Sequence, residues 1–307
     1  ELLSKTAEDF VRTNAPINHV RALRDAKDVV GFSQDLWKEM AKLGWTGILV
    51  PEAFGGAGLG LTDLAVVLEA LGKNLTPQPF LSTVLLAGQL VRTAGTAEQQ
   101  ETILPGIASG DAIAAVAYQE AYSRYFLNRV TTSAAKQADA WALSGEKIQV
   151  LDGQTADTFI VSARTAGEKD DTDGITLFLV RSDAPGVEVE PQNRLDGRAA
   201  AIVRLQNVSV PAKDILGPVQ RGLTALSHSV DVATVGLCAE MLGGMNQIFQ
   251  ETLTYLKARE QFGSVIGSFQ ALKHRAAKVF MEIELCRSTV MAAAAAVDNG
   301  ADDIPLL

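Results

Sequence analysis

The spacing of apolar residues changes twice along this chain, near residue 111 and again near residue 217. Before residue 111 and after residue 217, apolar residues recur at steps of three and four, which is typical of amphipathic helices. Between the two points, short β-like segments are separated by Gly, Asp and Pro clusters. The segments are 112–118, 140–150, 158–163, 175–180, 187–189 and 200–210. The pattern predicts a mostly α protein with a central antiparallel β-domain or small barrel.

This pattern divides the chain into three predicted domains: an N-terminal helical domain over 1–111, a middle β-domain over 112–217, and an incomplete C-terminal helical bundle over 218–307. The first domain has an apolar stripe formed by Phe32, Leu36, Met40 and Leu43. A second helix is expected from Asp63 to Leu71, with Thr62 as N-cap and Gly72 as the residue after its end. The run 96–99 matches a capping box, and Pro105 is expected to break the helix that it opens.

Two long helices are predicted in the C-terminal domain. The first runs roughly from Leu226 to Arg259, and the second from near Phe269, with Ser268 as N-cap, to Asn299–Gly300. Apolar residues at helical spacing predict the buried stripes of the pair: Val230, Ala233, Leu237, Met241 and Met245, then Val279, Ile283, Cys286 and Val290. Such a pair needs further helices to cover its apolar seam.

The segment that links these helices has more chemistry than a turn requires. Gly263 and Gly267 allow the backbone to bend and to approach another group closely. Around them stand donors suited to phosphates and nucleotide edges, and two flat apolar rings: Arg259, Gln261 and Gln270, with Phe262 and Phe269. A helix hairpin with a capped corner and a binding site explain this pattern equally well.

Composition excludes several classes of function. The net charge of −9 argues against nucleic-acid and anionic-membrane binding. No stretch reaches the ~20 apolar residues of a membrane span, and no metal-ligand spacing is present. The two cysteines, Cys238 and Cys286, are expected to be buried reduced thiols of a cytoplasmic protein. The chain begins at Glu1 without Met and ends at Leu307, so both ends are expected to be cut.

The run Arg-x-Gln-Phe-Gly-x-x-Ile-Gly-x-Phe-Gln-x-x-x-His, residues 259–274, resembles the signature of the acyl-CoA dehydrogenase family. The resemblance covers essentially the whole chain. It implies the order of parts predicted above, FAD as cofactor, and α,β-dehydrogenation of an acyl-CoA thioester in fatty acid metabolism. It also implies an electron-transfer flavoprotein or similar acceptor, and assembly as a homo-oligomer (dimer or tetramer) or as a hetero-oligomer with a related subunit.

The resemblance also assigns residues to the cofactor. In the linking segment Arg259, Gln261, Phe262, Phe269 and Gln270 are implied to hold the pyrophosphate and adenosine of an FAD shared across a dimer interface. In the β-domain, the family's Thr-Glu-Pro-x-x-Gly-Ser-Asp is replaced by residues 118–124, so that Gln119 takes the Thr place and Glu120 aligns. The family's Trp-Ile-Thr-Asn-Gly is replaced by Gln149, Val150, Leu151, Asp152 and Gly153. Backbone N–H groups there are still expected to reach the flavin.

The substrate and the catalytic base complete the implied site. Ser123 and Asp231 are the expected contacts to the CoA moiety, and Thr234 replaces the arginine that often accompanies the aspartate. The base is a glutamate expected beyond Leu307, because Ala233 occupies the alternative position used by a minority of the family. Glu240 is a second candidate base, with an interhelical ion pair or a partly exposed rim position as its alternative roles. The open alternative is a non-catalytic or half-catalytic subunit of a hetero-oligomer.

Overall fold

The computed structural model describes all residues except 1, 27, 302–303 and 305–307, and leaves out the side chain of Asn193. The chain forms two compact units. The first contains residues 1–20, 60–76 and 234–307, and the second contains residues 21–59 and 77–233. The long helix α7, Gly222–Ala258, and the short helix α2, Ile17–Ala26, each contribute residues to both units.

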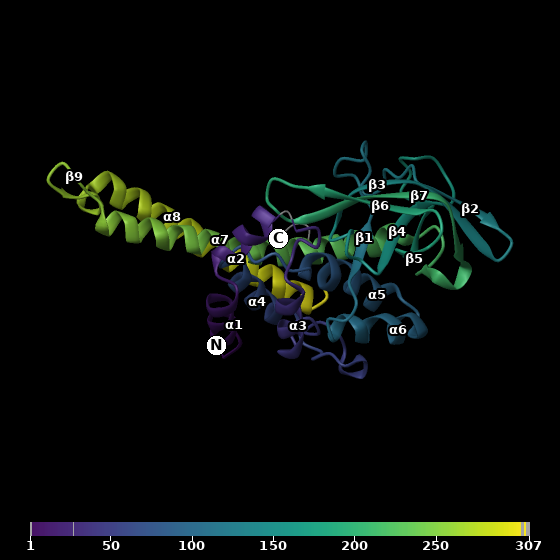
Figure 1. The fold of residues 1–307 in the computed structure, drawn as a ribbon, viewed down its shortest axis with the longest axis horizontal. Coiled ribbons are helices and arrows are strands. Elements are labelled where there is room, and N and C mark those ends of the chain that lie inside the picture. Colours follow the sequence, from purple (N-terminus) through teal and green to yellow (C-terminus); the bar gives the residue numbers. More distant parts are fainter. Residues whose placement is uncertain (1, 27, 302–303, 305–307) are drawn as a thin grey trace. The chain divides into compact units, whose positions relative to one another are not determined.

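The second unit is built on an eight-stranded sheet (Figure 1). Its strand order is β6-β7-β3-β2-β4-β5-β8, with β1 paired to β4. The strands are β1 (Ala114–Ala117), β2 (Ser133–Gln137), β3 (Ala140–Leu151), β4 (Thr158–Arg164), β5 (Ile175–Arg181), β6 (Val187–Asn193), β7 (Ala199–Pro211) and β8 (Ile215–Leu216). All six predicted segments are strands.

The prediction of an antiparallel domain was wrong in one respect, because the sheet is mixed. Strand β1 runs parallel to β4, and β2 meets β4 in one parallel pair, whereas the other pairings are antiparallel. Strand β2 was missed because its sequence, Ser-Ala-Ala-Lys-Gln, is mostly exposed and has little β propensity. Its pairing with β3 stabilises it through contacts that the local sequence does not contain.

The second unit also contains a cluster of aromatic side chains and several short helices. They are α3 (Gln34–Lys42), η1 (Glu52–Phe54), η2 (Phe80–Gly88), α5 (Gln89–Ala94), α6 (Ala97–Ala108) and η3 (Ala212–Asp214). The ring of Trp37 contacts Phe32 and Phe80 edge-on, at centroid distances of 6.5 and 5.0 Å. The predicted stripe is buried at Phe32, Leu36 and Met40, but Leu43 is exposed because it lies at the C-terminal cap of α3.

The capping box at the start of α6 is confirmed: Thr96 Oγ1 accepts from Gln99 N, and Gln99 Oε1 accepts from Thr96 N. The predicted break at Pro105 was wrong, because α6 continues through it to Ala108. Leu104 and Ile107 are fully buried on either side of the proline. Their packing stabilises the last turn although proline removes one backbone donor.

The first unit contains α1 (Leu2–Asn14), α4 (Leu61–Lys73), α8 (Gln270–Asp298) and residues 234–258 of α7. Helices α4 and α7 approach each other closely at two glycines. A Cβ on Gly72 would lie 1.9 Å from the carbonyl oxygen of Glu240, and a Cβ on Gly243 would lie 1.9 Å from that of Glu69. Only glycine allows this contact between two helix backbones.

Three predicted helix ends in this unit were wrong. Helix α4 has Gly60 as N-cap, and Thr62 and Gly72 lie inside it. The carboxylate of Asp298, at the end of α8, accepts hydrogen bonds from the first free N–H groups of α4, those of Leu61 and Thr62. A residue distant in sequence therefore does what a local cap was expected to do. Helix α8 has Phe269 as N-cap in place of Ser268, whereas its end at Asn299–Gly300 is confirmed.

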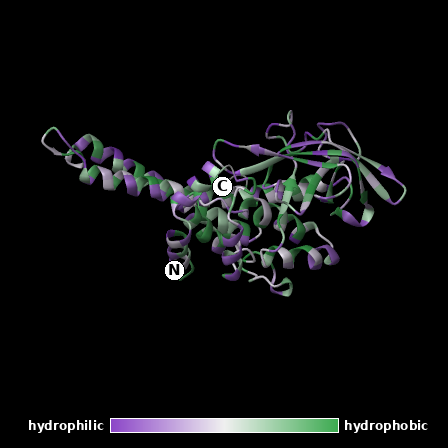
Figure 2. Cartoon of the chain, in the orientation of Figure 1, coloured by the Kyte–Doolittle hydropathy of each residue, from purple (hydrophilic) through white to green (hydrophobic). Residues whose placement is uncertain are grey.

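The predicted stripes of α7 and α8 identified the buried face only in part, because Ala233 and Ile283 are buried as predicted. The core of the pair is made by Leu242, Phe249 and Ile283, with Leu253 and Ala276 packed against them. Met241, Met245, Val279 and Cys286 are exposed, and so is Cys238. Apolar and polar residues alternate along both helices (Figure 2), so several faces satisfy helical periodicity. Within the residues that the structure describes, no helix has the length and hydropathy of a membrane span.

Candidate functional site

The structure brings together the two β-domain segments that were assigned to the flavin. The N–H of Ile148 on β3 donates to the carbonyl oxygen of Gln119 at 2.9 Å. This bond places the segment Gln119–Glu120 beside the segment Gln149–Leu151. Gln119 is partly exposed and Gln149 is exposed, so these side chains border solvent in the second unit.

The backbone of β3 is irregular at the assigned residues. The register between β3 and β7 shifts between Lys147 and Val150, and Gln149 has a left-handed φ of 51°. β-Bulges of this kind are over-represented beside active sites, where they reorient the chain. The bulge takes Ile148 and Gln149 out of register with β7, which fits the expectation that this backbone faces a planar cofactor.

A buried ion pair fastens the two segments to each other. Lys147 Nζ lies 2.7 Å from Glu120 Oε1 and 3.1 Å from Ser162 Oγ, and the lysine is 0% exposed. Glu120 also accepts hydrogen bonds from the backbone N–H groups of Thr131 and Thr132, at 2.8 and 3.0 Å, and from the Thr131 hydroxyl. The side chain of Glu120 therefore turns into the domain, and its neighbour Gln119 stays near the surface.

The electrostatics of this pair follow from its burial. Burial disfavours the carboxylate of Glu120, but Lys147 and the Thr131 donors outweigh it and lower the pKa of Glu120. Burial also lowers the pKa of Lys147, and Glu120 opposes that shift. The positive charge of Lys147 therefore stabilises the ionised form of Glu120, and the negative charge of Glu120 stabilises the ionised form of Lys147.

The hydroxyl group of Ser123 is hydrogen-bonded within a turn next to these segments. Its hydroxyl donates to the carbonyl oxygen of Glu120 at 2.9 Å and accepts from the Glu120 N–H at 3.0 Å, and the residue is buried. Tyr122, which precedes Ser123, is exposed, and so are Tyr125 and Phe126 in the loop that follows. The guanidinium of Arg129 lies 4.3 Å from the ring centre of Phe126. Exposed aromatic side chains therefore flank Ser123 along the chain.

The linking segment of the helix pair forms a two-residue β-hairpin. Strands β9 (Glu260–Gln261) and β10 (Ser264–Val265) pair around Phe262 and Gly263, which both have positive φ, 53° and 77°. This is the signature of a type I′ turn. The ring of Phe262 is 94% exposed and meets Phe269 edge-on. An exposed bulky residue in left-handed conformation is unusual, and here the two-residue turn requires it.

The donors of the linking segment are also on the surface. Arg259, Gln261 and Gln270 are exposed and Phe269 is partly exposed. Within its unit the hairpin lies at the end of the α7–α8 pair, away from α1 and α4 (Figure 1). Gly267 behaves as predicted, because a Cβ there would lie 2.7 Å from the carbonyl oxygen of Leu256. The segment presents its donors and rings outward on a fixed backbone.

The remaining candidates lie along α7. Asp231 is partly buried, and its pKa is raised by burial while His228 opposes the shift. Ala233 is buried and Thr234 is exposed. Glu240 is partly buried, between the partly buried Leu237 and the exposed Met241. The apolar stripe expected around Glu240 is therefore not a buried surface.

The sequence analysis did not identify Lys147, and it assigned no role to the side chain of Asp152. Lys147 shares strand parity with the buried Leu143 on the same strand, so alternation could have identified it as an inward lysine in need of a partner. The carboxylate of Asp152 accepts from Ser82 Oγ at 2.5 Å. The local sequence could not predict the contact between Asp152 and Ser82, because Ser82 lies in a distant helical part of the chain.

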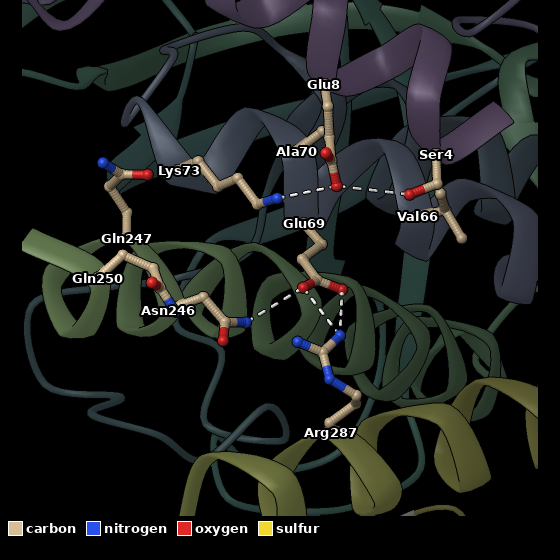
Figure 3. A pocket seen from close by; sticks show the side chains of 10 residues that line it. All are labelled: Ser4, Glu8, Val66, Glu69, Ala70, Lys73, Asn246, Gln247, Gln250 and Arg287. Atoms are coloured by element: carbon tan, nitrogen blue, oxygen red, sulfur yellow. Dashed lines mark hydrogen bonds and ion pairs between the residues drawn. The ribbon is translucent and has the colours of Figure 1, made fainter. Parts of the chain in front are cut away.

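The first unit contains a polar cavity of about 280 Å³ between α1, α4, α7 and α8 (Figure 3). Its charged groups pair with each other: Glu8 with Lys73 at 2.9 Å, and Glu69 with Arg287 at 2.9 Å. Asn246 also donates to Glu69, at 3.2 Å. Because these charged side chains pair with each other, they connect the helices around the cavity. We therefore assign no ligand to it.

Comparisons with known proteins show the family of this chain. The chain matches the acyl-CoA dehydrogenase N-terminal domain over residues 1–111, the middle domain over 115–208 and the C-terminal domain over 220–306. It is 31% identical over 268 residues to a probable acyl-CoA dehydrogenase, YngJ, of Bacillus subtilis, which covers 86% of this chain and 70% of YngJ.

Solved structures with the same fold include a steroid ACAD variant named Tcur3481-Tcur3483, at 34% identity and a TM-score of 0.86, covering 98% of this chain and 78% of that one. The ChsE4-ChsE5 complex from Mycobacterium tuberculosis matches at 28% identity, with the same TM-score of 0.86 and the same coverage of 98% and 78%. An FAD complex of PigA matches at 26% identity and a TM-score of 0.88, covering 99% and 81%. The chain therefore belongs to the acyl-CoA dehydrogenase family of FAD-dependent oxidoreductases.

Proposed function

We propose that this chain carries out α,β-dehydrogenation of an acyl-CoA thioester. The observation that carries the proposal is the bulge at Gln149, held beside Gln119 by the Ile148–Gln119 bond and by the buried Lys147–Glu120 pair. Bound FAD supplies the hydride acceptor that side chains lack. The protein supplies the fixed backbone and side chains that orient cofactor and thioester.

Each candidate residue has a role in this proposal. Gln119 and the backbone of 149–151 face the flavin ring, while the Glu120 side chain holds that backbone. The outward groups of the linking segment bind the pyrophosphate and adenosine of the FAD of a second protomer: Arg259, Gln261, Phe262, Phe269 and Gln270. Ser123, Asp231 and Thr234 border the CoA moiety. Exposure of the linking segment at the end of a helix pair suits a contact between protomers.

The proposed reaction needs a carboxylate that removes the α-proton of the thioester. Glu240 is the candidate on this chain, and Ala233 excludes the position seven residues earlier, since alanine cannot accept a proton. The test is Glu240→Gln, assayed by the bleaching of flavin absorbance on adding an acyl-CoA. Loss of bleaching with normal flavin content supports Glu240, and full bleaching removes it from the mechanism.

A second candidate function is a half-catalytic subunit of a hetero-oligomer. Ala233 and the replacement of the family's Trp and Thr by Gln149 and Leu151 favour it, and one structural neighbour is described as a complex of two differently named chains. Such a subunit would lend its linking segment to the flavin of a partner chain.

Purification separates the two functions. The full-length protein, expressed alone, is expected to be yellow and to be bleached by an acyl-CoA. A colourless protein that gains flavin only when co-expressed with a related chain supports the second function. A dimeric or tetrameric state, an electron-transfer flavoprotein as acceptor, a part in fatty acid metabolism and a cytoplasmic location belong to the same proposal. Mass analysis of the assembly, acceptor assays and cell fractionation test them.

A further inference from the structure

The end of strand β3 is tied to an unusual helix in the second unit. Residues 80–88 form η2, a nine-residue stretch with π-helical hydrogen bonding. π-Helical segments are rare and occur frequently at functional sites. Ser82 and Thr83 of η2 are 0% exposed. Thr83 Oγ1 donates to the Ala114 carbonyl on β1 at 3.0 Å, and Ser82 Oγ lies 2.5 Å from Asp152 Oδ2.

Asp152 directly follows the flavin-facing backbone of 149–151 and is anchored in three directions. Its N–H donates to Ala199 O at 3.1 Å, its carbonyl oxygen accepts from the Thr155 N–H and hydroxyl at 3.1 and 3.0 Å, and its carboxyl group meets Ser82. Its φ of 53° is left-handed. The side chain therefore connects a strained turn to a buried helix.

The hydrogen bonds that Ser82 makes depend on whether the carboxyl group of Asp152 is protonated. The Ser82 hydroxyl has one hydrogen but two acceptors, Asp152 Oδ2 at 2.5 Å and Pro79 O at 3.3 Å. If Asp152 is protonated, its O–H can donate to Ser82 Oγ, and the serine can donate to Pro79 O. If Asp152 is ionised, the Ser82 hydroxyl donates its hydrogen bond to the carboxylate, and the carbonyl oxygen of Pro79 no longer accepts one from Ser82.

Burial, one hydrogen bond and two positive charges act on the Asp152 carboxyl group. Burial raises the pKa of Asp152 to about 6, while the Ser82 hydrogen bond and the positive charges of Arg198 and Arg194 act in the opposite direction. Those two arginines, on the segment between β6 and β7, are the charged side chains that influence it. Both protonation states are therefore populated close to neutral pH.

We propose that Asp152 is a positioning residue, which fixes the backbone of 149–151 against η2 through a proton-dependent bond to Ser82. This inference rests on the proposed function, because it assigns the purpose of the bond to the flavin. The proton on Asp152 selects between two hydrogen-bond arrangements of the turn and the start of η2, and the flavin senses which one is present through the backbone of 149–151.

The first experiment titrates the flavin absorbance of the purified holoprotein from about pH 5 to about pH 8. We expect a spectral transition with its midpoint near pH 6 that is absent in Asp152→Asn, which keeps an amide for hydrogen bonding and tolerates a left-handed φ. Ser82→Ala is expected to raise the midpoint, because it removes a bond that favours the ionised form. The matched control is Asp139→Asn, an exposed carboxylate before β3, which should leave the titration unchanged.

A transition that persists in Asp152→Asn, or a midpoint that Ser82→Ala leaves in place, overturns the proposal. A second readout does not need bound flavin. With a pKa raised by folding, the native state holds the proton more tightly than the unfolded state, so the stability that Asp152 contributes is complete below about pH 4 and is lost as pH rises to about 6. The urea midpoint of wild type should therefore decline more steeply over this window than that of Asp152→Asn.

Equal slopes for the two proteins overturn the inference whether or not flavin is present. A protein that binds no FAD but shows the difference in slope refutes the proposed function alone, and it leaves the proton-dependent Asp152–Ser82 bond supported. The two failures are thus distinguishable in one set of samples.

Discussion

The β-domain site and the linking segment of the helix pair are proposed to hold opposite ends of the same kind of cofactor, yet they are stabilised in different ways. In the β-domain a buried lysine on β3 meets a glutamate twenty-seven residues earlier, and three further hydrogen bonds to that glutamate come from residues 131–132. In the linking segment the backbone is fixed by a two-residue turn, and its functional side chains are exposed.

The difference separates two ways of building a binding surface. The β-domain orients its flavin-facing backbone through interior contacts, so a change in the interior is expected to affect folding and binding together. The linking segment orients its side chains through local turn geometry. A change in one of its exposed side chains is therefore expected to alter binding and leave folding intact.

The largest effect is expected from Lys147→Met. This change leaves the Glu120 carboxylate buried without its counter-charge, which costs on the order of 3–5 kcal/mol of unfolding free energy. Urea unfolding followed by circular dichroism measures it. The double variant Glu120→Gln/Lys147→Met should recover part of the loss. Lys136→Met, an exposed lysine on β2, is the control and should change stability little. A single variant as stable as wild type would contradict the account of an anchored interior.

Arg259→Ala is expected to weaken FAD binding without affecting folding. Loss of a charge-assisted hydrogen bond costs about 1.5–3 kcal/mol, or about a 10- to 150-fold rise in the dissociation constant. Fluorescence titration of the deflavinated protein with FAD gives this value. Arg275→Ala, another exposed arginine of the same helix pair, serves as control. Retention of wild-type affinity in Arg259→Ala would remove the role assigned to the linking segment.

The smallest effect is expected at the base of the helix pair. Gly243→Ala places a methyl group 1.9 Å from Glu69 O, and overpacking of this kind costs about 1–3 kcal/mol. The neighbouring Gly244→Ala is the matched control, because its nearest atom, Gly72 O, would be 3.5 Å away. That substitution should be neutral or slightly stabilising through helix propensity. Thermal unfolding compares the two, and equal melting temperatures would show that the helices can separate at no cost.

Local patterns in the sequence predicted much of the fold. The six strands and the two long helices were predicted because their signals lie within each segment, in alternation, helical spacing and turn residues. The capping box at Thr96 was confirmed for the same reason. Errors arose where a partner distant in sequence decides the outcome. Asp298 caps α4, packing around Leu104 and Ile107 carries α6 past Pro105, and β3 provides the pairing of β2.

The same distinction applies to the candidate site. The sequence by itself indicated the bend of the linking segment, because Gly263 and Gly267 are local signals: Gly263 has a φ of 77°, and a Cβ on Gly267 would lie 2.7 Å from the Leu256 carbonyl oxygen. The left-handed φ of Phe262 did not follow from its residue type, because phenylalanine disfavours that conformation. Only the tertiary structure decided that Glu120 meets Lys147, that β3 bulges at Gln149, and that Asp152 reaches Ser82. Burial and charge pairing act between elements far apart along the chain, so local spacing could not contain them.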